Sequence, residues 1–212
     1  MTDPSTTWTI RNATSSDAMA AVACTVAAFE YDPHMAYLFH TSPEARRELM
    51  AEFFDILLGA RLALDMPAKV LVRNEDVLGL LMGNSAAPPA WPEQLNRRWG
   101  ELAGRQEGLA KRFQVSEDAV AATAPSAPHY YLGVVGVHPM LRGQGAGSAL
   151  IAEFCAESDR NPASSGVLLE TVSTANVAYY RRRGFEPRHQ AQLDGSSCLH
   201  ILFRPSRVTA HP

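Results

Sequence analysis

A glycine-rich segment in the second half of the chain has the residue types and spacing of a phosphate-binding turn. An apolar run at residues 130–137 ends in a His-Pro turn at 138–139. Residues 142–147, which read Arg-Gly-Gln-Gly-Ala-Gly, then lead directly into the apolar spacing of a helix. The first amides of a helix lack an intrahelical acceptor and lie at the positive end of its dipole, and glycine lets an anion approach the backbone closely. The segment therefore predicts a binding site for a pyrophosphate group.

Two common phosphate-binding loops do not fit this segment. A Walker loop needs a lysine directly before its Ser or Thr, and Ser148 follows a glycine instead. A dinucleotide fingerprint needs the spacing G-x-G-x-x-G, whereas Gly143, Gly145 and Gly147 recur at every second position. A third pattern, [Q/R]-x-x-G-x-[G/A] after a V-x-P turn, is matched in full by residues 137–147.

A second motif lies one helix and one strand further along the chain. Residues 167–172 read as a strand, and residues 176–185 have the form N-x-x-[FY]-Y-x-x-x-G-F. Within that strand Glu170 is a carboxylate among apolar residues, and burial there would raise its pKa and make it a better base. A salt-bridged or edge-facing Glu170 is the alternative, which the sequence leaves open.

The two motifs, in this order, resemble those of the GNAT superfamily of acetyl-CoA-dependent N-acetyltransferases. The resemblance implies an α/β fold with a central mixed, mostly antiparallel sheet of about seven strands flanked by helices. It also implies one domain over residues 1–212, with a fourth strand that carries a bulge and parts from the fifth. The implied reaction is acetyl transfer from acetyl-CoA to a primary amine of a small molecule, by direct attack in a ternary complex. A non-catalytic acetyl-CoA-binding module with a sensing or regulatory role is the alternative.

By the same resemblance, the cofactor lies along one strand and one helix start. Its extended pantetheine arm would pair with the backbone of Val135, Gly136 and Val137, as an added strand would. The N–H at or near Val137 would polarise the thioester carbonyl. The pyrophosphate would be held by the amides of Arg142, Gly143, Gln144, Gly145, Ala146, Gly147 and Ser148, with added charge from the arginine.

The second motif is expected to supply the general acid. Tyr180 stands where the superfamily places it, and a phenol with a pKa of about 10 stays protonated at neutral pH yet can donate to a departing thiolate. Tyr179 is the alternative. Asn176 is expected either to hydrogen-bond the cofactor or to cap its helix. The three arginines at 181–183 are interpreted as a solvated face, with contact between one of them and a cofactor phosphate left open.

Several residues are candidates for the base and for the contacts to the acceptor. Glu170 is the expected base, with Glu30, an ordered water or no base at all left open. Glu30 and Tyr31 follow the first helix, where superfamily members contact the acceptor. The chain looks most like puromycin N-acetyltransferase and its relatives, on the strength of residues 28–33 and 169–171 and the position of an insertion. That likeness implies an amine acceptor of the aminoacyl-nucleoside kind.

Residues 84–128 are expected to form this helical insertion between the third and fourth strands. Stretches rich in Pro and Ala bound it, and apolar residues recur inside it at roughly helical spacing. The plainer interpretation is an amphipathic helix that packs on the sheet. The functional interpretation is a wall over the acceptor site, and the two are compatible.

Composition narrows the classes of partner. The chain has 212 residues, a formal net charge of −3 and an isoelectric point of about 6.2, so no nucleic-acid partner is expected. Three scattered cysteines predict reduced thiols and no metal site. Neither a leader peptide nor a membrane-spanning run is visible. We therefore expect a cytoplasmic protein, with a homodimer left open.

Hydrophobic spacing predicts the elements that position these residues. Residues 14–17 resemble a capping box, and the residue before Pro33 disfavours a helix, so a first helix is expected between them. Ser42 and Pro43 are typical of a second helix start. The remaining expected elements are strands at 8–11, 69–73, 77–82, 188–193 and 199–204 and a long helix at 145–158.

Overall fold

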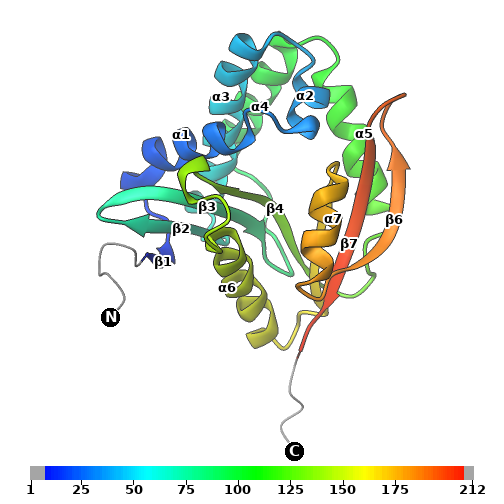
Figure 1. The fold of residues 1–212 in the computed structure, drawn as a ribbon. Helices are drawn as coiled ribbons and strands as arrows, with labels where there is room; N and C mark the ends of the chain where they lie inside the picture. Colours follow the sequence, from blue (N-terminus) through cyan, green and yellow to red (C-terminus); the bar gives the residue numbers. More distant parts are fainter. Residues whose placement is uncertain (1–7, 208–212) are drawn as a thin grey trace, which may run out of the picture.

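The computed structural model of the chain describes residues 8–207, which form one seven-stranded sheet with helices on both faces (Figure 1). The strands are β1 (Thr9–Asn12), β2 (Ala68–Arg73), β3 (Asp76–Asn84), β4 (Tyr130–Val137), β5 (Gly166–Thr171), β6 (Glu186–Gln192) and β7 (Cys198–Pro205). The helices are α1 (Ala18–Phe29), α2 (Pro33–Phe39), α3 (Pro43–Ala63), α4 (Glu93–Arg105), α5 (Leu109–Ala121), α6 (Ala146–Arg160) and α7 (Thr174–Arg181), with short 3₁₀ turns at Ser15–Asp17 and Pro139–Leu141.

The sheet order is β1-β2-β3-β4-β5-β7-β6, and every neighbouring pair is antiparallel except β4 and β5. The expected mixed, mostly antiparallel sheet of about seven strands is thereby confirmed. The helix starts also follow their sequence signals. Asp32 caps α2 by accepting from the His34 and Met35 amides, and Ser42 caps α3 by accepting from Ala45.

Each face of the sheet is covered by its own apolar core. On one face, α1, α2 and α3 pack against alternate residues of the central strands, such as Val70, Leu80 and Val134. On the other face, α6 and α7 pack against the residues that alternate with them, such as Leu71 and Leu81. This alternation follows from the period of two along a strand, because successive side chains point to opposite faces.

The two parallel strands at the centre of the sheet separate part-way along. β4 and β5 pair at three positions, the last of which joins Leu132 to Leu169, yet β4 continues to Val137. Just beyond that pair the register between β3 and β4 shifts, which leaves Gly133 as an extra residue on β4. The bulged fourth strand and its separation from the fifth are as the resemblance implied.

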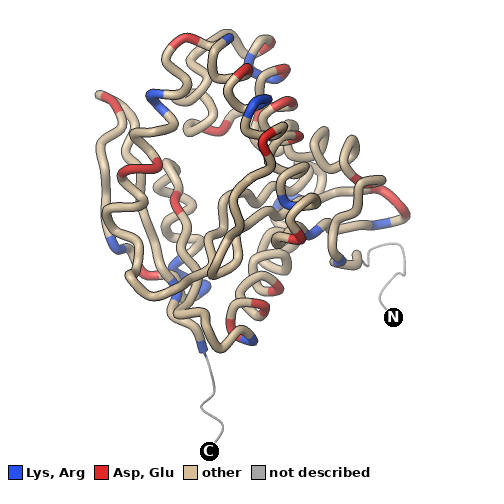
Figure 2. Tube along the Cα trace, turned by 180° about the vertical axis from the view of Figure 1, so that it is seen from behind, with Lys and Arg blue, Asp and Glu red and all other residues tan. Residues whose placement is uncertain are grey.

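The segment between β3 and β4 is helical, but not in the expected arrangement. It forms two helices, and α4 packs on α3 instead of on the sheet. Ion pairs join Arg98 to Asp55 at 2.9 Å and Arg105 to Glu52. Figure 2 shows acidic and basic positions interspersed over these outer helices.

Helix α5 connects the two halves of the divided sheet. In its first half, Leu109 and Phe113 pack into the apolar core that α2 and α3 share. Its second half, through Ala119 and Val120, packs against apolar residues of β5 and β7. The helix therefore crosses the opening that the separated strands leave.

The substitution Gly83→Ala should destabilise the protein by about 1–3 kcal/mol, because overpacking forces neighbouring groups to move. A Cβ at Gly83 would overlap Phe154 Cζ and would lie 2.7 Å from the Tyr131 carbonyl oxygen. Gly100→Ala is the matched control, since nothing lies within 4 Å of its Cβ position in the exposed face of α4. It should instead stabilise by about 0.5–1 kcal/mol. Urea unfolding measures both, and a Gly83→Ala midpoint equal to that of the native protein would contradict the prediction.

Candidate active site

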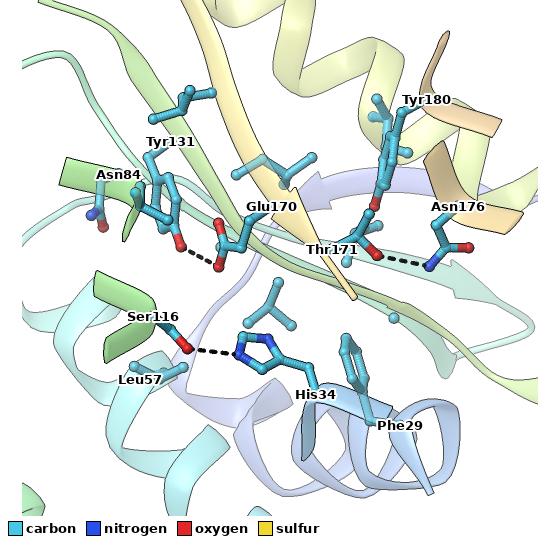
Figure 3. A pocket seen from close by; sticks show the side chains of 18 of the residues that line it. Phe29, His34, Leu57, Asn84, Ser116, Tyr131, Glu170, Thr171, Asn176 and Tyr180 are labelled. Atoms are coloured by element: carbon cyan, nitrogen blue, oxygen red, sulfur yellow. Dashed lines mark hydrogen bonds between the residues drawn. The ribbon is translucent and has the colours of Figure 1, made fainter. Parts of the chain in front are cut away.

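A cavity of about 1530 Å³ follows the opening between β4 and β5. Its walls come from the α1–α2 junction, from α3 and α5, from the facing edges of β4 and β5, and from the starts of α6 and α7. Figure 3 shows Tyr131 and Glu170 in contact on one side, Tyr180 and Asn176 on the other, and His34 with Ser116 across from them.

The glycine-rich turn lies at one end of this cavity. Gly143 and Gly145 have φ values of +80° and +86°, a region that residues with a Cβ adopt only with strain. The Arg142 and Gln144 amides donate to carbonyls of the preceding turn, so these two of the expected phosphate donors are already engaged. The three amides of the first turn of α6, at residues 146–148, have no intrahelical acceptor. Free amides at a helix start are suited to an anion.

Gly147 allows three elements to meet beside that helix start. A Cβ there would lie 3.2 Å from Tyr179 Oη and 3.6 Å from Val137 Cγ2. Ser148 Oγ lies 3.2 Å from the same Tyr179 hydroxyl. α6, α7 and β4 are thus brought together at one point of the cavity wall.

Arg183 lies over this junction, not on a solvated face as interpreted from the run at 181–183. Its guanidinium is 3.4 Å from the centroid of the Tyr179 ring and donates to the Tyr179 carbonyl and to Ser148 Oγ. Its buried Nε has no hydrogen-bond partner among the described residues. A positive charge therefore stands beside the first turn of α6.

The edge of β4 presents backbone groups to the opening. Along an antiparallel pair, residues that bond to the neighbour alternate with residues that point away. The His138 amide donates to the Leu78 carbonyl of β3 at 2.9 Å, and the register is unbroken back along the strand. Gly136 therefore bonds to β3, whereas the backbone groups of Val135 and Val137 face the opening. Of the three residues expected to contact the pantetheine arm, Gly136 has its backbone groups occupied.

Tyr180 is buried in the cavity wall beside Tyr179. Its ring packs edge-on against Phe185 at 5.7 Å, and its hydroxyl points into the pocket (Figure 3). Burial, followed by the nearby Tyr179 and Glu170, raises the pKa of Tyr180, so the phenol keeps its proton. Tyr179 also lines the cavity, but its hydroxyl lies 3.2 Å from Ser148 Oγ and its carbonyl accepts from Arg183.

Asn176 faces the same pocket from the first turn of α7. Its Nδ2 donates to Thr171 Oγ1 at 3.4 Å. The residue that caps α7 is Ser173, whose Oγ accepts from the Asn176 amide. The interpretation of Asn176 as a helix cap is therefore wrong, and its side chain is directed toward β5.

Glu170 is partly buried, at the point where β5 leaves β4. Its Oε1 accepts a hydrogen bond of 2.6 Å from Tyr131 Oη, while its buried Oε2 has no partner among the described residues. None of the ion pairs within residues 8–207 includes it. Burial raises the pKa of Glu170 to about 7, and the hydrogen bond from Tyr131 opposes that shift.

The two residues expected to contact the acceptor do not line the cavity. Glu30 forms an ion pair with Arg47 at 2.8 Å, and Tyr31 is 88% exposed. The cause is local: Asp32 caps α2, and the chain turns there so that Asp32 and His34 line the cavity instead. The Asp-Pro pair was the signal that could have indicated Asp32.

Residues distant in the sequence complete this end of the cavity. His34 Nε2 lies 3.2 Å from Ser116 Oγ of α5, and burial lowers the pKa of His34 to about 4, so its imidazole is neutral at pH 7. Burial also raises the pKa of Asp32. Arg61 is buried and donates to two carbonyls and to Asn84 Oδ1. The aromatic side chains of this end are Phe29, Phe53, Phe54, Trp91, Trp99 and Phe113.

Glu170 should make the stability of the protein depend on pH. Its pKa of about 7 in the folded state lies above the ordinary 4.5, so the folded state binds more protons between these values and stability falls as the pH rises through them. Glu170→Gln removes this effect. Between about pH 4 and about pH 8, the unfolding free energy of Glu170→Gln should therefore rise by about 3 kcal/mol relative to that of the native protein.

Urea unfolding at a series of pH values tests this prediction. Glu93→Gln is the matched control, because the side chain of Glu93 is 91% exposed and its substitution should give a nearly constant difference. Parallel stability curves for the native protein and Glu170→Gln would contradict the prediction.

No helix within residues 8–207 combines the length and the apolar character needed to cross a membrane. In the same residues, no group of three or more His, Cys, Asp or Glu side chains is placed to hold a metal ion.

Comparison with solved structures identifies the fold. A Corynebacterium glutamicum protein described as histone acetyltransferase HPA2 and related acetyltransferase superposes with a TM-score of 0.69 at 24% identity, covering 96% of this chain and 99% of that one. Drosophila melanogaster polyamine N-acetyltransferase gives 0.63 at 16% identity, covering 94% and 100%. Arylalkylamine N-acetyltransferase 2 from Aedes aegypti gives 0.66 at 12% identity, covering 93% and 98%. The sheet and its flanking helices are thus those of the GNAT fold.

Comparison with family models agrees with this fold. Residues 108–187 match the model described as acetyltransferase (GNAT) domain. The matched stretch contains β4, the glycine-rich turn at 142–147, β5 with Glu170, and the second motif at 176–185. The matched stretch is thus similar to a GNAT acetyltransferase domain, in agreement with the fold of the whole sheet.

Proposed function

We propose that the protein transfers the acetyl group of acetyl-CoA to a primary amine of a small molecule, by direct attack in a ternary complex within a single domain. The observation that carries the proposal is the continuous path through the cavity. The path begins at the free amides of the α6 start, follows the open edge of β4 and ends between Tyr180 and Glu170. It has the order of groups that a pyrophosphate, an amide-rich arm and a thioester need.

The residues along this path fit acetyl-CoA. The pyrophosphate would be held by the amides of Ala146, Gly147 and Ser148, with positive charge from Arg142 and Arg183. The amides of the pantetheine arm would pair with the backbone groups of Val135 and Val137, in the way that an added strand pairs with a sheet edge. Asn176 Nδ2 would contribute a hydrogen bond from the opposite wall.

Acetyl-CoA supplies the acetyl group as a thioester, so that a C–N bond to the amine forms while the C–S bond breaks. The Val137 amide would donate to the carbonyl oxygen as negative charge develops on it, and such a donor contributes about 2.7–4 kcal/mol in comparable sites. Tyr180 would give its proton to the departing sulfur, since burial keeps the phenol protonated. Glu170 would accept the proton that the amine loses.

The pKa of Glu170 supports its assignment as the base. A general base works best when its pKa lies near the operating pH, and burial brings Glu170 to about 7. At slightly alkaline pH most molecules then carry the carboxylate form, which can take a proton directly or through one water. Glu30 is unsuited to act as the base, because it forms an ion pair with Arg47.

A compact organic amine is the proposed acceptor. The cavity end beyond Glu170 combines aromatic side chains with the carboxylates of Asp32 and Glu117, and the guanidinium of Arg61 is bound by protein acceptors. Such a lining suits a cation with an apolar body. The names of two structural neighbours, a polyamine and an arylalkylamine N-acetyltransferase, agree with this class.

Three free cysteines support a reducing compartment such as the cytoplasm.

Tyr180→Phe should lower turnover by about 10²–10⁴-fold while acetyl-CoA binding stays unchanged, because only the proton donor is removed. The assay is thiol release from acetyl-CoA at about pH 8 against puromycin, aminoglycosides, polyamines, arylalkylamines, amino acids and short peptides. Tyr179→Phe is the matched control, since it deletes the neighbouring hydroxyl that faces Ser148. Its loss should be much smaller than that of Tyr180→Phe.

Two outcomes would count against the proposal. Equal losses in the two variants would remove the assignment of Tyr180 as the acid. Acetyl-CoA binding by calorimetry without thiol release on any amine would favour a non-catalytic module that senses acetyl-CoA.

A further inference from the structure

Tyr131 and Glu170 form a side-chain bridge where the central strands part. Tyr131 lies on β4, directly before the last position that pairs with β5, and Glu170 is the first residue of β5 beyond that position. The hydrogen bond of 2.6 Å between them is therefore the first contact across the opening after the backbone pairing ends (Figure 3).

The sequence around the bulge makes room for this bridge. A Cβ on Gly133 would lie 3.1 Å from Tyr131 Cε1, so the ring lies against a residue without a side chain. A Cβ on Gly83 would lie 2.7 Å from the Tyr131 carbonyl oxygen. Two glycines of the β3–β4 bulge thus allow Tyr131 its position, which ties the bridge to the same irregularity that opens the sheet.

The two carboxyl oxygens of Glu170 differ in their hydrogen bonding. Oε1 is occupied by the phenol, and Oε2 is buried without a hydrogen-bond partner among the described residues. A buried carboxylate oxygen without a partner is costly unless a ligand or a proton satisfies it. The phenol holds the carboxyl group by one acceptor site of Oε1, so the oxygen left without any partner is Oε2.

Charged and titratable groups on four other elements surround the pair. Glu117 of α5 acts on both members and raises the pKa of each, while Arg61 of α3 lowers the pKa of Tyr131. The charge of Glu170 contributes to the raised pKa of Tyr180 on α7. Asp32, at the start of α2, lines the same cavity. Against this acidic surrounding, the Tyr131 hydrogen bond favours the ionised form of Glu170.

We propose that Tyr131 is a positioning residue of the acetyl-transfer site, which donates a hydrogen bond to Glu170 Oε1 so that Oε2 is the atom that takes the proton of the acceptor amine. The inference rests on the proposed function and adds to it a second residue on the opposite strand. The proton moves from the amine nitrogen to Oε2, and the phenol keeps its own proton throughout. Tyr131 thus acts through Glu170 and does not itself react.

The first test measures the carboxyl group directly and needs no acceptor. The native protein and its variants are labelled with ¹³C at the glutamate carboxyl carbon, and the Glu170 signal is identified by its loss in Glu170→Gln. In Tyr131→Phe, which keeps the ring but removes the hydrogen bond, the pKa of Glu170 should rise by about one unit. In Glu117→Gln, which removes a negative charge facing the same pair, it should fall.

The second test uses turnover with an amine that the native protein acetylates. The acid limb of the kcat profile reports groups in the complex, so it should move to higher pH in Tyr131→Phe and to lower pH in Glu117→Gln. In a Glu170→Gln background, Tyr131→Phe should cause little further loss, because a residue that acts through another gives non-additive effects. Circular dichroism and acetyl-CoA affinity check that each variant is folded.

The outcomes separate this inference from the proposed function. An unchanged pKa of Glu170 in Tyr131→Phe, or a full additional loss of rate in the Glu170→Gln background, would overturn the role of Tyr131. A shifted pKa in a protein that acetylates no amine would instead contradict the proposed reaction, and with it the catalytic part of the inference. A loss of rate in Tyr131→Phe with an unmoved acid limb would reduce Tyr131 to a structural role.

Discussion

The early end of pairing between β4 and β5 is the constraint on which the rest of the molecule depends. Backbone amides and carbonyls inside a protein need partners, and β4 loses those on its β5 side after the pair of Leu132 and Leu169. The bulge at Gly133 turns the strand at the same point. A free strand edge is thereby held open at the centre of a sheet, where a ligand can complete its hydrogen bonds.

The separation persists because each half is packed independently and α5 joins the two. β3 bonds β4 on one side and β7 bonds β5 on the other, so both parted strands keep their outer neighbours. α5 packs on the α2–α3 core with its first half and on β5 and β7 with its second. The resulting cavity has two chemically distinct ends: free amides and arginines beside α6, and carboxylates with aromatic side chains beside α5.

Desolvation sets the protonation states in this cavity. It favours the neutral forms of Tyr180, His34 and Glu170, and only for Glu170 does the shift bring the pKa to about 7. That burial reduces stability above this pH, because an ionised carboxylate with a free oxygen remains inside the protein. The same feature that costs stability supplies a group able to accept a proton near neutral pH.

Local sequence patterns determined the elements, the free amides at the start of α6 and the phenol of the second motif, because glycine spacing, helix caps and strand alternation act over a few residues. Tertiary structure decided the rest. It turned Glu30 and Tyr31 away from the cavity, brought Asp32 and His34 into it, engaged the Gly136 backbone with β3 and moved Arg183 over Tyr179. It also joined Tyr131 to Glu170, residues of two strands separated by a helix. No local pattern encodes such a contact, since it arises only where the register and the bulge of a sheet bring distant side chains within hydrogen-bonding distance.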